Sequence, residues 1–204
     1  MNWVAMFPGQ GSQQAGMGKE LLDKYSDLLI DDFEETLGWS LQEIILKGNQ
    51  EEVTKTNIAQ PYIFAISYCY GLEVIEKIGL PKVGIGHSLG EYTALSLSGI
   101  LSYKDALEII AIRGKAMQEA VEGSNTTLAA VLTSNLESTI KERLVNQIDN
   151  SVMFYNQILN IEKLEQPESW YHIGPGNVTA GMVKKSISSK SVKVVNSLDS
   201  LNDI

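Results

Sequence analysis

The chain has 204 residues, of which 44% are hydrophobic and 20% are charged, and its formal net charge is −9 at pH 7. This composition is ordinary for a water-soluble globular chain, and the length suits one core, so we expect residues 1–204 to form a single domain. The acidic charge argues against nucleic acid and anionic membrane surfaces as partners. No apolar run could span a bilayer, the N-terminus lacks the features of a signal peptide, and the lone Cys69 favours a reducing compartment. We therefore expect a cytoplasmic location.

The first predicted element is a strand over residues 3–7. Its sequence, Trp-Val-Ala-Met-Phe, is apolar throughout, which is typical of a strand that is buried on both faces of a parallel sheet. A glycine-rich loop follows over residues 8–13, but neither G-x-G-x-x-G nor a Walker A lysine is present, so we exclude a nucleotide site there. Helical spacing of apolar residues then predicts helices over 20–35, 41–46 and 57–77.

The segment from Val83 to Tyr92 dominates the rest of the chain. A short β-branched run ends in Gly86-His87-Ser88-Leu89-Gly90 and passes directly into a helix-like segment. Strand, sharp turn and helix with a serine at the apex form the nucleophile elbow, which needs glycines where the strand and the helix approach closely. The N-terminus of the helix would point free N–H groups at an oxyanion formed beside Ser88.

Strands and helices alternate after the elbow. We predict helices near 102–121, 136–148 and 178–187, and strands near 128–132, 170–173 and 192–195. This alternation predicts an α/β fold in which helices flank a layered, mainly parallel sheet. Function in such sheets gathers at the loops beyond the carboxyl ends of the strands, which here are the loops after residues 7, 86 and 173.

Five motifs together resemble the malonyl-CoA:acyl-carrier-protein transacylase family, the acyltransferases of fatty-acid and polyketide synthesis. The resemblance is dense over residues 1–132 and looser over 142–190, and the motifs occur in the family's order. They are Phe7-Pro8-Gly9-Gln10-Gly11-Ser12-Gln13, Gln60-Pro61, Gly86-His87-Ser88-Leu89-Gly90-Glu91-Tyr92, Arg113-Gly114-Lys115-Ala116-Met117-Gln118 and Ile173-Gly174-Pro175-Gly176.

The resemblance implies a role for each matching residue. Ser88 would carry the acyl group as an ester, and the backbone N–H groups of Gln10 and Leu89 would form the oxyanion hole. Arg113 would bind the free carboxylate of a malonyl group, for which a guanidinium fork suits better than lysine, and Gln60 would line the same pocket. The substrates implied are malonyl-CoA or another acyl-CoA and the phosphopantetheine thiol of an acyl carrier protein, with no bound cofactor and no metal.

One part of the family pattern is absent. The family activates its serine with a histidine on a later strand, beyond a small ferredoxin-like subdomain, whereas here residues 133–150 lead to the C-terminal region without a histidine. Only His87 and His172 exist in the chain. His87 belongs to the elbow turn and suits a structural role, and His172 is the sole candidate for a base, although a core or surface histidine is the more common case at such a position.

Three interpretations remain open for the mechanism. The chain could be a working transferase that recruits His172, water or a partner's base, or an impaired member that binds acyl-CoA or carrier protein without turnover. It could also be a shortened form of an ordinary transacylase. The elbow alone would also suit a serine acyl hydrolase, which does not require Arg113. Without the small subdomain we expect an open cleft beside Ser88, covered by a second copy of the chain or by a partner.

Overall fold

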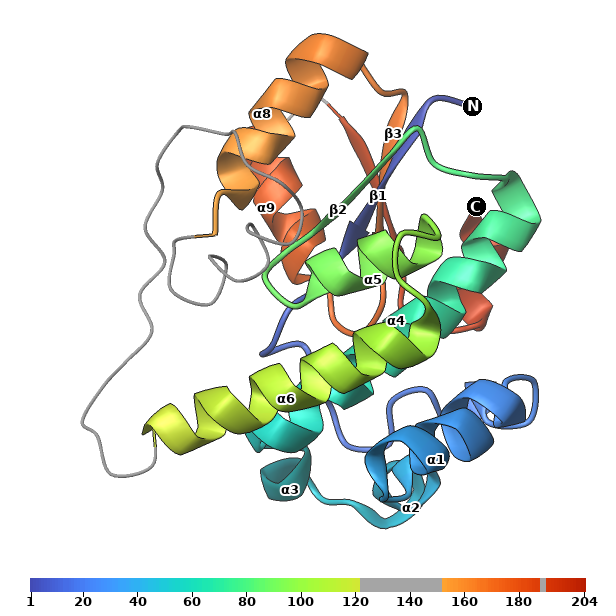
Figure 1. Cartoon of the computed structure of the whole chain (residues 1–204). Helices are drawn as coiled ribbons and strands as arrows, with labels where there is room; N and C mark the ends of the chain where they lie inside the picture. The colour runs from blue at the N-terminus through green and yellow to red at the C-terminus, as the bar shows by residue number, and fades with distance from the viewer. Residues whose placement is uncertain (122–151, 188–189) are drawn as a thin grey trace.

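The fold is a parallel four-stranded sheet with helices on both faces (Figure 1). The computed structural model describes residues 1–121, 152–187 and 190–204. The strands are β1 (Trp3–Phe7), β2 (Val83–Gly86), β3 (Ser169–Ile173) and β4 (Ser191–Val195), in the order β2-β1-β3-β4. All three neighbouring pairs are parallel, so the predicted α/β sheet is confirmed.

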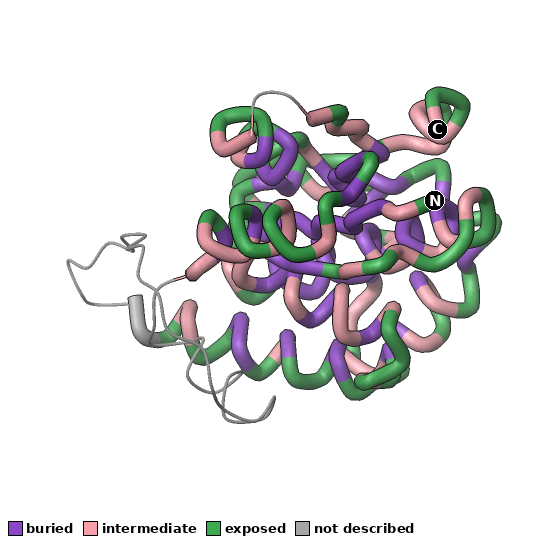
Figure 2. The backbone as a smooth tube through the Cα atoms, turned by 90° about the horizontal axis from the view of Figure 1, so that it is seen from above, coloured by how far each residue is buried: buried purple, intermediate pink, exposed green. Residues whose placement is uncertain are grey.

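β1 is an inner strand, and this explains why its sequence has no polar side. Trp3, Ala5 and Phe7 belong to the core cluster shared with α4 (Thr56–Ile78), whereas Val4 and Met6 belong to a second cluster on the other face. That second cluster includes residues of α8 (Phe154–Glu165) and α9 (Val178–Ser186). Figure 2 shows buried segments in the interior and exposed turns outside.

The remaining helices cover the α4 face of the sheet. α5 (Gly90–Leu97) and α6 (Tyr103–Val121) both pack against α4, and α1 (Phe33–Leu37), α2 (Leu41–Lys47) and α3 (Gln50–Thr54) lie beyond them in Figure 1. The strands at 3–7 and 170–173 and the helices at 41–46, 57–77, 102–121 and 178–187 therefore agree with the prediction to within a few residues. The strand and helix predicted near 128–132 and 136–148 lie outside the described residues.

The single helix predicted over residues 20–35 is wrong. The segment consists of a 3-10 turn, η1 (Lys19–Leu21), a π-helical turn, η2 (Asp27–Asp32), and α1, which ends at Gly38 with a φ of 72°. The inward side chains recur at every fourth residue, namely Leu21, Tyr25, Leu29 and Phe33. An α-helix has 3.6 residues per turn, so a strict spacing of four drifts around it, and the wider π turn keeps Leu29 and Phe33 directed inward.

Three elements were not predicted at all. They are α3, α8 and the C-terminal 3-10 turn η3 (Asp199–Asp203). None of the helices that the structure describes is both long enough and apolar enough to traverse a bilayer.

Candidate active site

Ser88 occupies a strained turn between the end of β2 and the start of α5. Its φ is +54°, a left-handed value that residues with a side chain rarely adopt. The flanking glycines are needed for space, because a Cβ at Gly86 would collide with the backbone nitrogen of Glu91 and one at Gly90 with the carbonyl oxygen of Phe7. The structure thus has a tight strand–turn–helix junction with Ser88 at its apex, at the position that the sequence predicts.

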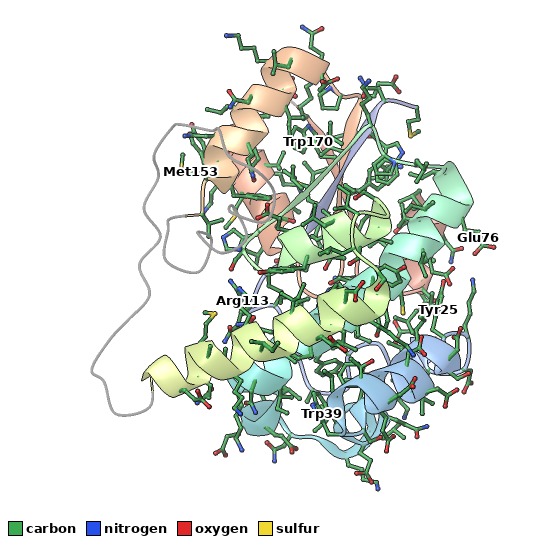
Figure 3. All side chains as sticks on the ribbon, viewed as in Figure 1. Tyr25, Trp39, Glu76, Arg113, Met153 and Trp170 are labelled. Atoms are coloured by element: carbon green, nitrogen blue, oxygen red, sulfur yellow. The ribbon has the colours of Figure 1, made fainter. Side chains whose placement is uncertain are left out.

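Arg113 reaches this turn from α6 (Figure 3). One guanidinium nitrogen donates a hydrogen bond to the Ser88 Oγ at 2.9 Å, and the other terminal nitrogen donates to the Gln60 Oε1 at 2.5 Å. The Arg113 side chain is buried and forms no ion pair with an acid in the described part of the chain. Burial accordingly lowers the pKa of its guanidinium.

Gln60 and Gln10 extend this contact into a polar chain. The Gln60 amide nitrogen donates to the Gln10 Oε1 at 3.2 Å and lies 3.2 Å from the Met117 Sδ. The Gln10 amide nitrogen in turn donates to the Thr56 hydroxyl at 3.0 Å. Motifs that are more than 100 residues apart in the sequence therefore meet at one place, as the sequence predicts for the loops at the carboxyl edge of the sheet.

The loop that carries Gln10 packs directly on the elbow. A Cβ at Gly9 would lie 2.6 Å from the carbonyl oxygen of His87, and the His87 N–H donates to the carbonyl of Phe7 at 3.0 Å. In the described residues, the backbone N–H groups of Gln10 and Leu89 donate to no other group. Two unused donors on facing turns suit the oxyanion hole proposed for these residues.

His172 lies away from this chain of contacts. It is fully buried on β3, with its Nδ1 2.6 Å from the Thr179 hydroxyl and its Nε2 3.2 Å from the carbonyl oxygens of Gly174 and Pro175. Carbonyl oxygens only accept, so Nε2 carries the proton and Nδ1 accepts from Thr179. Burial lowers the pKa of the ring to about 4. Both nitrogens are thus occupied in holding the loop after β3, and the structure does not support His172 as the base for Ser88.

His87 is also placed for packing. Its ring lies edge-on to Phe154 of α8, with centroids 5.6 Å apart, and burial lowers its pKa. The prediction of a structural role suits this position. Within the described residues there is also no cluster of three or more side chains that could hold a metal ion.

Two contact residues were missed from the sequence. Thr56 lies one helical turn before Gln60 on α4 and bonds to Gln10, and its backbone N–H donates to the side chain of Gln118. The i, i+4 spacing with Gln60 was the available signal, although a threonine at the start of a helix is far too common to stand out. Met117 was quoted as part of a motif, but its contact with Gln60 needed the structure.

Comparisons with known proteins agree with this geometry. The acyl transferase domain family matches residues 4–160. A malonyl CoA-acyl carrier protein transacylase of Bacillus subtilis is 38% identical over 165 residues, which is 79% of this chain and 50% of that protein. A polyketide biosynthesis malonyl CoA-acyl carrier protein transacylase of Bacillus velezensis is 31% identical over 71% of this chain and 50% of that protein.

Solved structures extend the likeness to the whole fold. An acyl carrier protein S-malonyltransferase from Vibrio cholerae superposes with a TM-score of 0.86 at 21% identity, covering 100% of this chain and 99% of the other. The chain therefore belongs to the acyl transferase domain family. Curated relatives of the chain are named malonyl CoA-acyl carrier protein transacylases, and the chain spans about half the length of those relatives.

Proposed function

We propose that this chain transfers a malonyl-type acyl group from CoA to the phosphopantetheine thiol of an acyl carrier protein through an ester on Ser88. The observation that carries the proposal is the buried guanidinium of Arg113, which forms no salt bridge in the described residues, feels the charge of Glu91 only at a distance, and bonds to the Ser88 Oγ. A buried cation is unfavourable unless something compensates it, and a carboxylate on the substrate would do so.

The chemistry follows from these contacts. The Ser88 oxygen attacks the thioester carbon, and the resulting oxyanion accepts hydrogen bonds from the N–H groups of Gln10 and Leu89. Collapse breaks the carbon–sulfur bond, and the departing CoA thiolate takes up the proton that Ser88 gives up. The carrier protein's thiol then attacks the ester in the reverse sense. Arg113 holds the far carboxylate of the acyl group and so orients its carbonyl at Ser88.

A second candidate function is binding of the acyl-CoA without turnover. It is favoured by the occupied nitrogens of His172 and by the guanidinium on the Ser88 Oγ, since a guanidinium cannot accept a proton. Loss of the base in such a site lowers the rate by several orders of magnitude, while the oxyanion hole and the bound geometry leave residual catalysis.

Intact-mass spectrometry after mixing with malonyl-CoA separates these cases. We expect a malonyl adduct on the unmodified chain and on Ser98→Ala, a matched serine at the far end of α5, and none on Ser88→Ala. Transfer of the adduct to added holo carrier protein would support the transferase, whereas its loss to water alone would indicate a hydrolase. No adduct, with malonyl-CoA still bound in a calorimetric titration, would support the second candidate.

Self-association over the cleft beside Ser88 stays a prediction, which sedimentation would test.

A further inference from the structure

An apolar cleft of about 480 Å³ opens on the α4 face of the sheet, near the start of β2. Its floor is formed by side chains of β1, which are nearly fully buried, and its walls by α4 and α5. The mouth is lined by the link between α4 and β2 and by the end of α5. The residues that decide its character are Trp3, Ile75, Leu80, Lys82, Gly84 and Leu97.

The cleft exists because of one glycine. Val83 and Ile85 pack with the α8 and α9 cluster, so position 84 of the same strand faces α4 and α5. Gly84 has no side chain to fill this space, and a Cβ built there would meet only the Ala94 Cβ at 3.6 Å. Gly71, which also lines the cleft, lets α4 approach Leu97 of α5 so closely that a Cβ would collide with that side chain.

Among the described residues, the only charge at the mouth of the cleft is the positive charge of one lysine side chain. Lys82 is the only charged residue among the fourteen that line the cleft, and no acidic residue lines it. Lys82 is exposed and forms no ion pair in the described part of the chain. Its backbone N–H donates to the carbonyl of Trp3 at 2.9 Å, so the main chain of Lys82 lies beside the start of β1, which forms the floor.

We propose that this cleft binds the aliphatic chain of a fatty acid, with the carboxylate at Lys82. The volume falls within the range of small-molecule sites, about 300–1,000 Å³, and an apolar interior with one cation at its mouth matches an apolar tail with one anionic end. Ser88, Gln10, Gln60 and Arg113 are not among the lining residues. The site is therefore separate from the acyl-transfer site and does not rest on the proposed function.

Titration with decanoate, followed by calorimetry, tests the proposal on the full chain. We expect one saturable site, and we expect Gly84→Val to weaken binding at least tenfold, because the new side chain fills the cleft and suits a strand. Circular dichroism and the melting temperature would show that this variant is folded. Gly181→Ala, on an exposed face of α9 with no neighbour within 4 Å, is the matched control and should bind like the original chain.

Further variants and a second ligand test the role of the carboxylate of decanoate and the position of its binding site. We expect Lys82→Met to weaken decanoate binding about threefold, as for an exposed ion pair, and Lys163→Met on α8 to leave it unchanged. Decylamine should bind more weakly than decanoate, and Ser88→Ala should bind decanoate normally. Undiminished binding by Gly84→Val, equal binding of decylamine, or loss of binding in Ser88→Ala would each overturn the proposal.

Discussion

Arg113 is the residue on which substrate selection depends in this site. Its two terminal nitrogens donate hydrogen bonds to Ser88 and Gln60. A planar carboxylate could accept both of these hydrogen bonds in place of the two side chains, because its two oxygens match the two terminal nitrogens of a guanidinium. An ammonium would keep the charge and lose the fork.

We therefore expect Arg113→Lys to reduce malonyl loading of Ser88 by about tenfold or more, and acetyl loading far less, since an acetyl group has no free carboxylate. The ratio of the two loading rates, measured by intact mass with malonyl-CoA and acetyl-CoA, checks this. Lys115→Met, an exposed lysine on the same helix, is the control. An equal fall for both acyl groups would mean that Arg113 supports the elbow and does not select the substrate.

His172 makes the stability of the fold depend on pH. The folded ring has a pKa of about 4, below the value of about 6.5 that it has in an unfolded chain, because its charged form is buried. Between these values the unfolded chain binds a proton that the folded chain does not. The contribution of the neutral His172 to the free energy of unfolding is thus fully present above pH ~6.5. It is lost as the pH drops toward ~4, by up to about 3 kcal/mol.

Urea denaturation at pH 7.5 and pH 4.5 measures this contribution. Because carboxylates also titrate in the lower range, the informative quantity is the difference between the original chain and His172→Gln. We expect the stability of the variant to fall less between the two pH values, even if the variant is less stable at pH 7.5. An identical fall in both proteins would contradict the burial of a neutral ring.

The individual site residues were largely predictable from the sequence, but their bonds were not. Ser88 and Arg113 were found because the elbow and the motif around the arginine have fixed residue types. The place of His172 depends on Thr179, seven residues later on α9, and on two carbonyls of the following loop. A sequence shows that a histidine exists but not that both of its nitrogens are used.

At the scale of elements, the junction between β2 and α5 depends on two glycines for its close approach. Gly90→Ala would press a methyl group into the carbonyl of Phe7, which is backbone and cannot rotate away. We expect a loss of at least about 1–3 kcal/mol of stability and a loss of Ser88 acylation. Gly181→Ala, in the open on α9, should instead gain up to about 1 kcal/mol. Urea denaturation compares the two, and a Gly90→Ala protein as stable as the original would show that the turn tolerates a wider spacing.

The elements that were predicted well are those with a continuous pattern. β1, α4 and α6 have long or uniformly apolar sequences, so period and length define them. The segment over 20–35 failed because its spacing of four suits neither a straight α-helix nor a strand. α3 is five residues long and begins at the Asn49 cap, a local signal that is weak without the neighbouring helix against which it packs.

At the scale of the whole molecule, the sheet order makes β1 and β3 the most protected strands. Both have a neighbouring strand on each side, whereas β2 and β4 each have one neighbouring strand among the residues that the structure describes. We expect the amides of β1 and β3 to exchange with solvent deuterium only through global unfolding, and those of β2 to exchange faster through local opening. Hydrogen exchange as a function of low urea concentration distinguishes the two. Faster exchange in β1 than in β2 would contradict the order β2-β1-β3-β4.

The same order has a consequence for synthesis in the cell. β1 ends at Phe7 and its neighbour β3 begins at Ser169, so roughly 160 residues separate them. At about 5–20 residues per second, a ribosome needs about 8–30 s to add that length. During this time Trp3–Phe7 can pair with β2 alone, and one edge of a wholly apolar strand stays open to other chains. We therefore expect aggregation to be most frequent between nascent chains on neighbouring ribosomes. A chaperone that covers the first strand would help most at this stage.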